Sequence, residues 1–473
     1  MHHEITDLSA RVLAAGIRSR EFSAVDALEA HLAQIDLVNP TINAIVTLDR
    51  DAALATARAA DDRTLRDPGG LPPLHGVPMT HKDTHNTAGL RTTQGSPIFR
   101  DFVPDFDDVI IERMKAAGVI TTGKSNVPEF AAGSHTFNEV FGTTVNPWDP
   151  SLSAGGSSGG VAAAIAARIQ PIGDGSDMGG SLRVPASFCN VVGFRPSPGV
   201  VPSLPSRDVW SWLGQAGTMA REVGDIALVM SAIAGDHPQS PFRSPVAAQA
   251  FAAPLEGDLT GVRVAFSRDF GLGIPVDAAV LRVFDAQLAV FESLGAHVEE
   301  AAPDLGEADL VFANVRAMEF ALRLGGIVEQ HGDLVKEEIR WNVEKGWAMT
   351  SRDQVETTLA RSRLEGSVQR FFGRFDVLAT PTAQVLPFDA AQRYPTTVAG
   401  VELDTYLGWM RSACVISATG LPALAVPAGF SGTGLPVGLQ LVANRGRDVE
   451  LLRVGHAYEQ ATRHFERTPP LLR

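Results

Sequence analysis

The 473-residue sequence has only two cysteines, Cys189 and Cys414, and they do not form a CxxC pair. Two cysteines are too few for a disulfide framework, so the sequence indicates a reducing compartment, and we expect a cytoplasmic protein. No run of about 18 apolar residues occurs, which argues against a transmembrane helix. The first 23 residues mix charged with apolar residues, unlike a signal peptide. We therefore expect no contact with a membrane.

Basic residues are also scarce relative to acidic ones. The 40 Lys and Arg residues stand against 54 Asp and Glu, which gives a formal net charge of −14 at pH 7. Nucleic-acid affinity depends mainly on Lys and Arg side chains that neutralise phosphates, and no dense basic run occurs. The sequence therefore predicts no nucleic-acid partner. It also has no His/Cys cluster at ligand spacing, so we expect no metal and no cofactor.

Glycine and proline, by contrast, are abundant, with 45 and 30 residues. Many turns and loops favour an enzyme over a scaffold. In the helical N-terminal part, Gly16 is expected to end one helix, and Ser23 to cap the next, which should stop before Asn39-Pro40. From His75 onward, short β-type runs alternate with Ala-rich helices, which predicts an α/β layered fold. We expect the strands from both ends of the chain to join one sheet.

Residues 118–125 match the GxxxxGK[ST] pattern of a phosphate-binding loop. Such a loop must follow a strand and open a helix, so that backbone N–H groups point at phosphate. Here the pattern predicts the reverse order: a helix over 108–117, a stop at Gly118 and a strand over 119–122. Nucleotide binding is therefore disfavoured.

Residues 155–159 match the GxSxG pattern of the α/β-hydrolase nucleophile elbow. That elbow needs a strand before it, but a turn-rich stretch with two prolines precedes Gly155. It also needs a downstream histidine, and none is singled out by its context. An elbow with Ser157 as nucleophile is therefore disfavoured.

A larger constellation surrounds the same glycines. Residues 155–160 read Gly-Gly-Ser-Ser-Gly-Gly and open an Ala-rich helix over 161–169. Residues 173–186 follow as Gly-Asp-Gly-Ser-Asp-Met-Gly-Gly-Ser-Leu-Arg-Val-Pro-Ala. The first segment alone is typical of a flexible linker, but Asp, Gly-Gly-Ser and Arg beside a Pro-Ala step are not linker composition.

This constellation resembles the signature of the amidase signature family of Ser-Ser-Lys hydrolases. Residues 75–83, His-Gly-Val-Pro-Met-Thr-His-Lys-Asp, resemble the segment that holds the family's lysine. Residues 123–130, 375–382 and 434–440 are similar to other family segments. The resemblance covers nearly the whole chain and is weakest over 200–374, where family members differ.

The resemblance implies the amidase signature fold, an α/β fold with a central mixed twisted β-sheet covered by helices on both faces. We interpret residues 1–473 as a single domain. Within it we expect a helical N-terminal region over 1–65, a catalytic core segment over 75–200 and a divergent, substrate-shaping region over 201–374.

The resemblance also implies a catalytic triad. Ser181 would be the nucleophile, and Ser157, expected in a cis peptide, would bridge it to Lys82. To act as a base, Lys82 must be neutral part of the time, so burial must lower its pKa from about 10.4 toward neutrality. A facing carboxylate would raise that pKa, so we expect the neighbouring Asp83 to point away.

The oxyanion of the reaction needs donors, and the backbone N–H groups of Met178, Gly179, Gly180 and Ser181 are expected to supply them, because glycine lets consecutive amides converge. Supporting roles are expected for three further residues. Asp177 and Arg183 should pair beneath this loop, and Ser158 should either hydrogen-bond near the nucleophile or cap the helix. Cys189 is expected to be a small buried residue rather than a second nucleophile.

The substrate is less determined by the sequence. Ala132 and Gly133 resemble the family stretch that runs along the substrate channel, and their small side chains would leave room for a bulky group. Trp210 is a candidate pocket wall, although ordinary packing fits it equally well. We expect a hydrolase that cleaves the C–N bond of a small-molecule amide, such as an anilide, with carbamates (urethanes) or esters also accepted. Such an aryl acylamidase or urethanase would have this amide as its partner, and a homodimer is slightly favoured over a monomer.

Two other functions stay open. One is the glutamine-hydrolysing subunit of a tRNA-dependent amidotransferase, which shares the triad but works inside a complex. Asp174 and Met178 depart from the typical wording of that subunit's signature. The other is a binding module with an inactive site, which the presence of all three triad residues disfavours.

Overall fold

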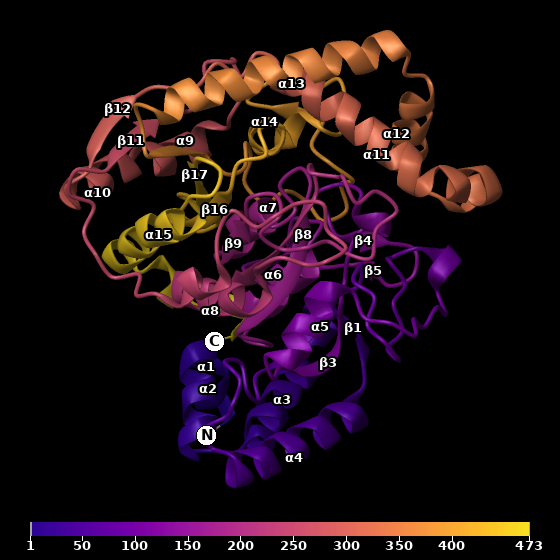
Figure 1. The fold of residues 1–473 in the computed structure, drawn as a ribbon, viewed down its shortest axis with the longest axis vertical. Helices are drawn as coiled ribbons and strands as arrows, with labels where there is room; N and C mark the ends of the chain where they lie inside the picture. The colour runs from indigo at the N-terminus through magenta and orange to yellow at the C-terminus, as the bar shows by residue number, and fades with distance from the viewer. Residues whose placement is uncertain (1, 473) are drawn as a thin grey trace.

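The computed structural model describes residues 2–472, and its centre is an eight-stranded sheet (Figure 1). In spatial order the strands are β12 (His297–Glu300), β11 (Arg263–Phe266), β13 (Val377–Pro381), β17 (Pro436–Ala443), β16 (Ala423–Phe430), β9 (Val192–Arg195), β10 (Gln215–Ala220) and β8 (Ile172–Asp177). β11 pairs in parallel with β12 and β13, and the other neighbours pair antiparallel. The sheet is mixed, as the sequence predicted.

Helices cover both faces of this sheet. The strands carry apolar side chains on both faces, and these side chains pack into different apolar clusters. In β17, Leu439 and Leu441 enter one cluster and Val442 enters another. The first cluster includes side chains of α8 (Val223–Ile233), α9 (Ala278–Asp285), α10 (Gln287–Ser293) and α15 (Asp448–Thr462). The second includes side chains of α7 (Arg183–Cys189), α11 (Ala308–His331), α13 (Ser351–Phe372) and α14 (Arg411–Ser417). The predicted fold class, with helices on both faces, is confirmed.

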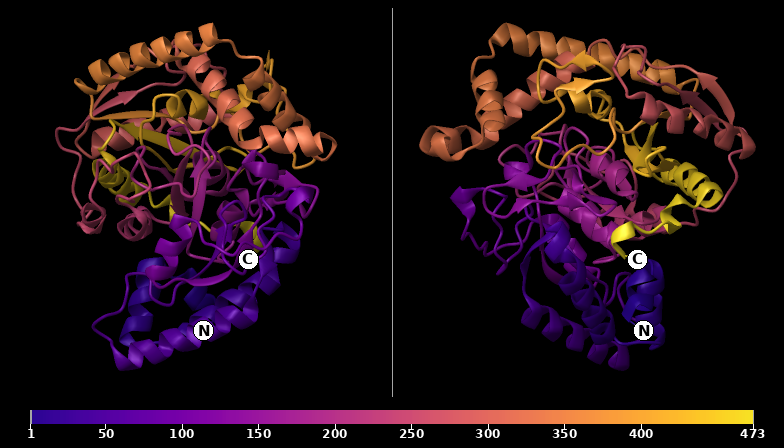
Figure 2. Two further views of the ribbon diagram at one scale, coloured as in Figure 1. Left: turned by 45° about the vertical axis from the view of Figure 1, so that its right-hand side comes forward. Right: turned by 180° about the vertical axis from the view of Figure 1, so that it is seen from behind.

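The N-terminal helices lie together at one end of the molecule (Figure 2). They are α1 (His2–Asp7), α2 (Ala10–Ser19), α3 (Ala24–Ile42) and α4 (Arg50–Arg66). Two of their predicted ends are wrong. α2 continues three residues past Gly16, whose Cα instead faces the Phe22 ring, so closely that a Cβ would meet it at 2.5 Å. α3 passes through Pro40 and ends at Ile42, with Asn43 as its C-cap, because a proline in the last turn removes only one helical N–H.

The expectation of one sheet is wrong for the early strands. β1 (Ile45–Leu48), β3 (Ile120–Ser125) and β2 (Pro78–Lys82) form a separate three-stranded sheet. Backbone N–H groups of β2 that could otherwise pair with β8 donate to side-chain oxygens instead. The N–H of Thr80 donates to Gln170 Oε1 at 2.9 Å, and the N–H of Lys82 donates to Asp174 Oδ2 at 3.2 Å.

The segment around the phosphate-loop pattern folds as predicted. α5 (Val109–Ala116) ends before Gly118, which has a φ of +93°, and β3 follows. Lys124 lies within β3 rather than at a helix N-terminus, and it is buried.

The remaining strands are short hairpins, and the remaining helices are α6 and α12. These elements are β4 (Phe137–Asn138), β5 (Gly142–Thr143), β6 (Val145–Asn146), β7 (Asp149–Ser153), α6 (Gly159–Ala166), α12 (Glu337–Trp347), β14 (Thr397–Val398) and β15 (Val401–Glu402). Among the helices within residues 2–472, none has both the length and the apolar character needed to cross a membrane.

Asp225 of α8 connects the N-terminal helices to the main sheet, and its replacement tests that connection. Its buried carboxylate accepts hydrogen bonds from the N–H groups of Ala10 (2.8 Å) and Arg11 (3.0 Å). In Asp225→Asn one of the two accepting oxygens is replaced by an amide N–H₂, so one of these buried backbone N–H groups loses its acceptor. We therefore expect the free energy of unfolding to fall by about 2–3 kcal/mol in urea titrations.

Glu222→Gln is the matched control, because Glu222 also pairs with Arg11 but does so at the partly exposed surface. It should cost less than about 1 kcal/mol. Equal losses in the two variants would contradict the proposed connection.

Candidate active site

Lys82 lies at the end of β2 and is fully buried. Its Nζ donates to the hydroxyls of Ser157 (2.8 Å) and Ser158 (2.9 Å). It also contacts the hydroxyl of Ser176 at 3.0 Å and its carbonyl oxygen at 3.4 Å. The structure therefore brings together the predicted Lys82 and Ser157, and surrounds the amine with uncharged oxygens.

Burial lowers the pKa of Lys82 to about 7, although the carboxylates of Asp177 and Asp174 act in the opposite direction. An amine with this pKa is neutral in a large fraction of molecules near pH 7. It can therefore accept a proton from a hydroxyl that contacts it.

The Asp83 carboxylate points away from Lys82, as predicted. It accepts hydrogen bonds from the N–H of Thr93 at 3.1 Å and from the Thr93 hydroxyl at 2.5 Å. It is also absent from the charged groups that shift the pKa of Lys82. Lys124 is the cation that acts on Asp83.

Asp174 and two histidines form a buried network behind Lys82 that the sequence did not predict. His81 Nδ1 lies 2.8 Å from Asp174 Oδ1, and His85 Nδ1 lies 2.5 Å from Asp174 Oδ2. Burial alone would raise the pKa of Asp174, but the histidines hold it well below its usual range. The only local signal was a pair of histidines four positions apart around the lysine.

The loop before α6 presents Ser157 and Ser158 to Lys82. The Gly156–Ser157 peptide bond is cis. Gly155 has a φ of +77°, and a Cβ on Gly156 would lie 2.9 Å from the backbone nitrogen of His135, so both positions require glycine. Ser158 stands at the N-cap of α6 without a side-chain capping bond, so its hydroxyl serves the lysine and not the helix.

Ser181 follows β8 at the turn into α7, and its side chain lines the same pocket as Ser157. Its carbonyl oxygen accepts the N–H of Ser158 at 3.2 Å, which joins the two loops. Within residues 2–472 the Ser181 hydroxyl makes no hydrogen bond, so the relay from Ser181 through Ser157 to Lys82 stays a prediction.

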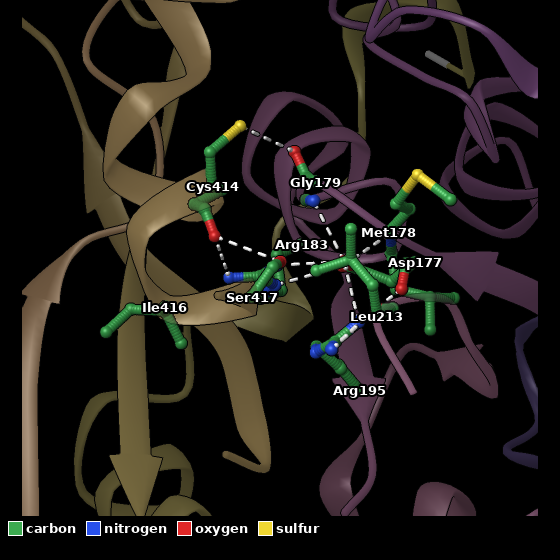
Figure 3. Close-up of polar contacts among 12 residues, drawn as sticks. Asp177, Met178, Gly179, Arg183, Arg195, Leu213, Cys414, Ile416 and Ser417 are labelled. Carbon is green, nitrogen blue, oxygen red and sulfur yellow. Dashed lines mark hydrogen bonds and ion pairs between the residues drawn. The ribbon is translucent and has the colours of Figure 1, made fainter. Parts of the chain in front are cut away.

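Asp177 anchors the loop that carries Ser181 (Figure 3). Its carboxylate accepts hydrogen bonds from Arg183 at 2.8 and 2.9 Å, which is the predicted pair, and Arg195 lies 3.5 Å away. Burial alone would raise the pKa of Asp177, but the two guanidinium groups keep it well below its usual range. Arg183 also reaches Ala413 and Ser417 of α14, so this ion pair joins the loop to the late part of the chain.

The predicted oxyanion donors are only partly free. The N–H of Gly180 donates to Asp177 Oδ1 at 2.8 Å, so the structure gives it another partner. Within the described residues, the N–H groups of Met178, Gly179 and Ser181 make no such bond. An oxyanion site at this loop therefore has these three as its candidate donors.

A pocket of about 420 Å³ opens over Ser157 and Ser181. Gly133 lines it, whereas Ala132 lies behind it, with its carbonyl accepting a hydrogen bond from Lys336. Much of the irregular segment 201–211 also lines the pocket. The other lining residues include Phe130, Met178, Arg316, Phe320, Leu324 and Ile327.

Trp210, one candidate for the pocket wall, is not among the residues that line this pocket. Its side chain is 67% exposed and packs edge-on against Phe242. The sequence could not show this, because an aromatic residue in an irregular segment can face either way. Cys189 and Cys414 are buried free thiols whose pKa values burial raises, which favours the unreactive thiol over the thiolate. In the part of the chain that the structure describes, no group of three His, Cys, Asp or Glu side chains could hold a metal ion.

A model of the family described as Amidase matches residues 26–452. The chain belongs to the amidase signature family. A glutamyl-tRNA(Gln) amidotransferase subunit from Chloroflexus aggregans is 36% identical to it over 100% of this chain and 99% of the relative. Among solved structures, a bacterial aryl acylamidase of the amidase signature family has a TM-score of 0.89 at 25% identity, covering 97% of this chain and 98% of that chain. The corresponding amidotransferase subunit from Thermotoga maritima has a TM-score of 0.74 at 26% identity, covering 96% and 95%.

These relatives overturn the expected set of partners. We expected a small-molecule amide alone, with no nucleic acid and at most a second copy of the chain. The relative from Chloroflexus aggregans is, by its name, one subunit of an amidotransferase for glutamyl-tRNA(Gln). The net negative charge alone does not exclude a nucleic-acid partner. A protein can take part in a tRNA-dependent reaction as one subunit of an assembly without binding the tRNA through its own surface.

The pH dependence of Ser181 modification tests the protonation state of Lys82. The rate of reaction with a fluorophosphonate probe should rise with pH to a plateau, with a midpoint near 7, because only neutral Lys82 can accept the proton. Asp174→Asn removes a carboxylate that raises this pKa, so the midpoint should move to lower pH.

Asp108→Asn is the matched control for this shift. Asp108 is also a carboxylate near the site, but it does not act on Lys82. Its variant should keep the wild-type midpoint. An unchanged midpoint in Asp174→Asn would contradict the claim that the Asp174 carboxylate raises the pKa of Lys82.

Proposed function

We propose that this amidase hydrolyses the side-chain carboxamide of glutamine as one subunit of a tRNA-dependent amidotransferase. The observation that carries the proposal is the 36% identity to the amidotransferase subunit from Chloroflexus aggregans, over 100% of this chain and 99% of that relative. The contact of 2.8 Å between Lys82 Nζ and Ser157 Oγ supports the chemistry. The ammonia released from glutamine is the group that an amidotransferase transfers.

In the proposed mechanism the Ser181 hydroxyl attacks the amide carbon, and its proton passes through Ser157 to neutral Lys82. The oxyanion is stabilised by the N–H groups of Met178 and Gly179. Protonated Lys82 then returns the proton through Ser157 to the leaving nitrogen, which departs as ammonia. Water hydrolyses the resulting ester of Ser181 by the same proton path, releasing the acid and restoring the hydroxyl.

A second candidate is the hydrolysis of a bulkier amide such as an anilide, with carbamates and esters as further substrates. Its specific support is the pocket wall formed by Phe130, Phe320 and Leu324, together with the TM-score of 0.89 to an aryl acylamidase. Apolar walls fit an aryl or alkyl group better than a small polar amino acid.

The organisation of the chain stays part of the proposal. We take residues 1–473 as one domain, with the helical region 1–65, the catalytic core segment 75–200 and the substrate-shaping region 201–374. We place its activity in the cytoplasm, where the free thiols of Cys189 and Cys414 would stay reduced.

Peptide mapping after fluorophosphonate labelling tests the triad. The label should lie on Ser181, disappear in Ser181→Ala and fall at least about 100-fold in rate in Lys82→Ala, because general-base catalysis is lost. Ser176→Ala is the matched control, since Ser176 also contacts Lys82 but is not proposed to transfer its proton. A label on Ser157 instead would contradict the assigned nucleophile.

Ammonia release decides between the two substrate classes. Wild-type protein, alone and with the other subunits of its amidotransferase, should release ammonia from glutamine, and Ser181→Ala should not. An amidase that cleaves an anilide through Ser181 but leaves glutamine intact under both conditions would support the second candidate.

A further inference from the structure

Arg316 of α11 is a buried cation in the wall of the active-site pocket. Only 4% of its surface is exposed, and it lines the same pocket as Ser157 and Ser181. Its Nη1 lies 3.2 Å from the sulfur of Met178, the residue that begins the turn leading to Ser181. The guanidinium group therefore sits beside the loop that carries the proposed nucleophile.

The hydrogen-bond donors of Arg316 are poorly satisfied. Nη2 donates to the Tyr406 hydroxyl at 2.8 Å, but Nη1 has only a thioether sulfur, which is a weak acceptor. Nε is buried and has no hydrogen-bond partner. Such a desolvated cation is costly unless an anion contacts it.

No carboxylate within the described residues forms an ion pair with Arg316, which distinguishes it from the two buried arginines near the site. Arg183 and Arg195 both lie within ion-pair distance of Asp177. The acidic residue one turn from Arg316 is Glu319, whose Oε1 accepts a hydrogen bond from Ser211 at 2.8 Å. Burial raises the pKa of Glu319, although the charges of Arg323 and Arg316 act in the opposite direction, and Glu319 makes no ion-pair contact with Arg316.

Two aromatic rings lie beside the guanidinium group and restrict its movement. Its central carbon lies 4.3 Å from the centre of the Phe320 ring and 5.9 Å from the centre of the Tyr406 ring. The Tyr406 hydroxyl is held in turn by Asn342 Nδ2 at 2.7 Å. A guanidinium group whose movement is restricted is suited to bidentate binding of a planar carboxylate.

We propose that Arg316 binds a carboxylate of the substrate, so that the pocket selects amides that carry an anionic group away from the scissile bond. The inference rests on the proposed function in one respect, the placing of the reacting amide at Ser181. If the substrate is glutamine, its α-carboxylate is the group bound. Arg316 is then a specificity-determining residue of the region 201–374.

Protection of Ser181 from the fluorophosphonate probe tests this without requiring turnover. The competitors are glutaramate, succinamate and 4-carbamoylbenzoate, each compared with its methyl ester, which keeps the amide and loses the charge. In the wild-type protein at least one acid should protect Ser181 at a concentration at least about 30-fold lower than its ester, a ratio typical of a charged hydrogen-bonded pair. Arg316→Met should remove this difference, and Arg316→Lys should retain part of it.

Arg323→Met is the matched control. Arg323 lies on the same helix and lines the same pocket, but it is exposed. Its variant should change protection by the acids less than about threefold, as expected for a solvated charge. The labelling rate without competitor reports whether each variant keeps an intact triad.

The outcomes separate this inference from the proposed function. Protection by an acid that depends on Arg316, without ammonia release from glutamine, would support Arg316 as a carboxylate site and contradict the glutamine proposal. Equal protection of Ser181 by acids and esters in the wild-type protein would overturn the carboxylate site. So would a loss of protection that is equal for acids and esters in Arg316→Met and in Arg316→Lys. If Arg316→Met fails to fold, Arg316→Lys and the acid-to-ester ratio of the wild-type protein decide the question.

Discussion

The site depends on keeping the amine of Lys82 away from water and from any carboxylate in direct contact. Bulk water would return its pKa to that of an ordinary lysine, and a directly paired carboxylate would raise it further. The fold meets both conditions. It surrounds the amine with the oxygens of Ser157, Ser158 and Ser176, and it turns Asp83 toward Thr93. The more distant Asp174 and Asp177 moderate the loss of solvation without pairing with the amine.

Asp177 gives the neighbouring loop its shape by a different means. This carboxylate accepts two backbone N–H groups, those of Gly180 and Leu182, besides the two bonds from Arg183. The turn that presents Ser181 is therefore held from beneath by an ion pair that has no access to solvent. The contrast with Arg316 is informative, because the same kind of side chain is neutralised where it supports the loop and left without an anion where it faces the pocket.

Local patterns in the sequence predicted much of this arrangement. Alternating strand and helix patterns predicted an α/β layered fold, and the mixed sheet with helices on both faces was implied by the resemblance to the amidase signature family. Lys82, Ser157, Ser181 and the Asp177–Arg183 pair followed from short family segments, although the roles of the triad residues stay predictions. What the sequence could not predict depends on distant contacts. His81 and Asp174 are 93 positions apart, and Arg316 looks like a residue of a solvated helix face until Tyr406 and Met178 are placed around it. The place of Trp210 could not be predicted for the same reason, since burial is set by tertiary packing.

The order of strands in the large sheet has a consequence for how the chain matures. β16 and β17 lie between β9 and β13, so residues 423–443 join two groups of strands that precede them in the chain, one complete at Ala220 and the other at Pro381. During synthesis, the half of the sheet that carries Ser181 therefore has an open edge at β9 until residues 423–430 have been made. Pairing between strands so far apart in sequence is slow, and an open apolar edge invites association with other chains. Arg183 receives its contacts from Ala413 and Ser417 in the same late stage. A nascent chain would thus hold Ser181 in an unfinished pocket until residues 423–443 have joined the sheet.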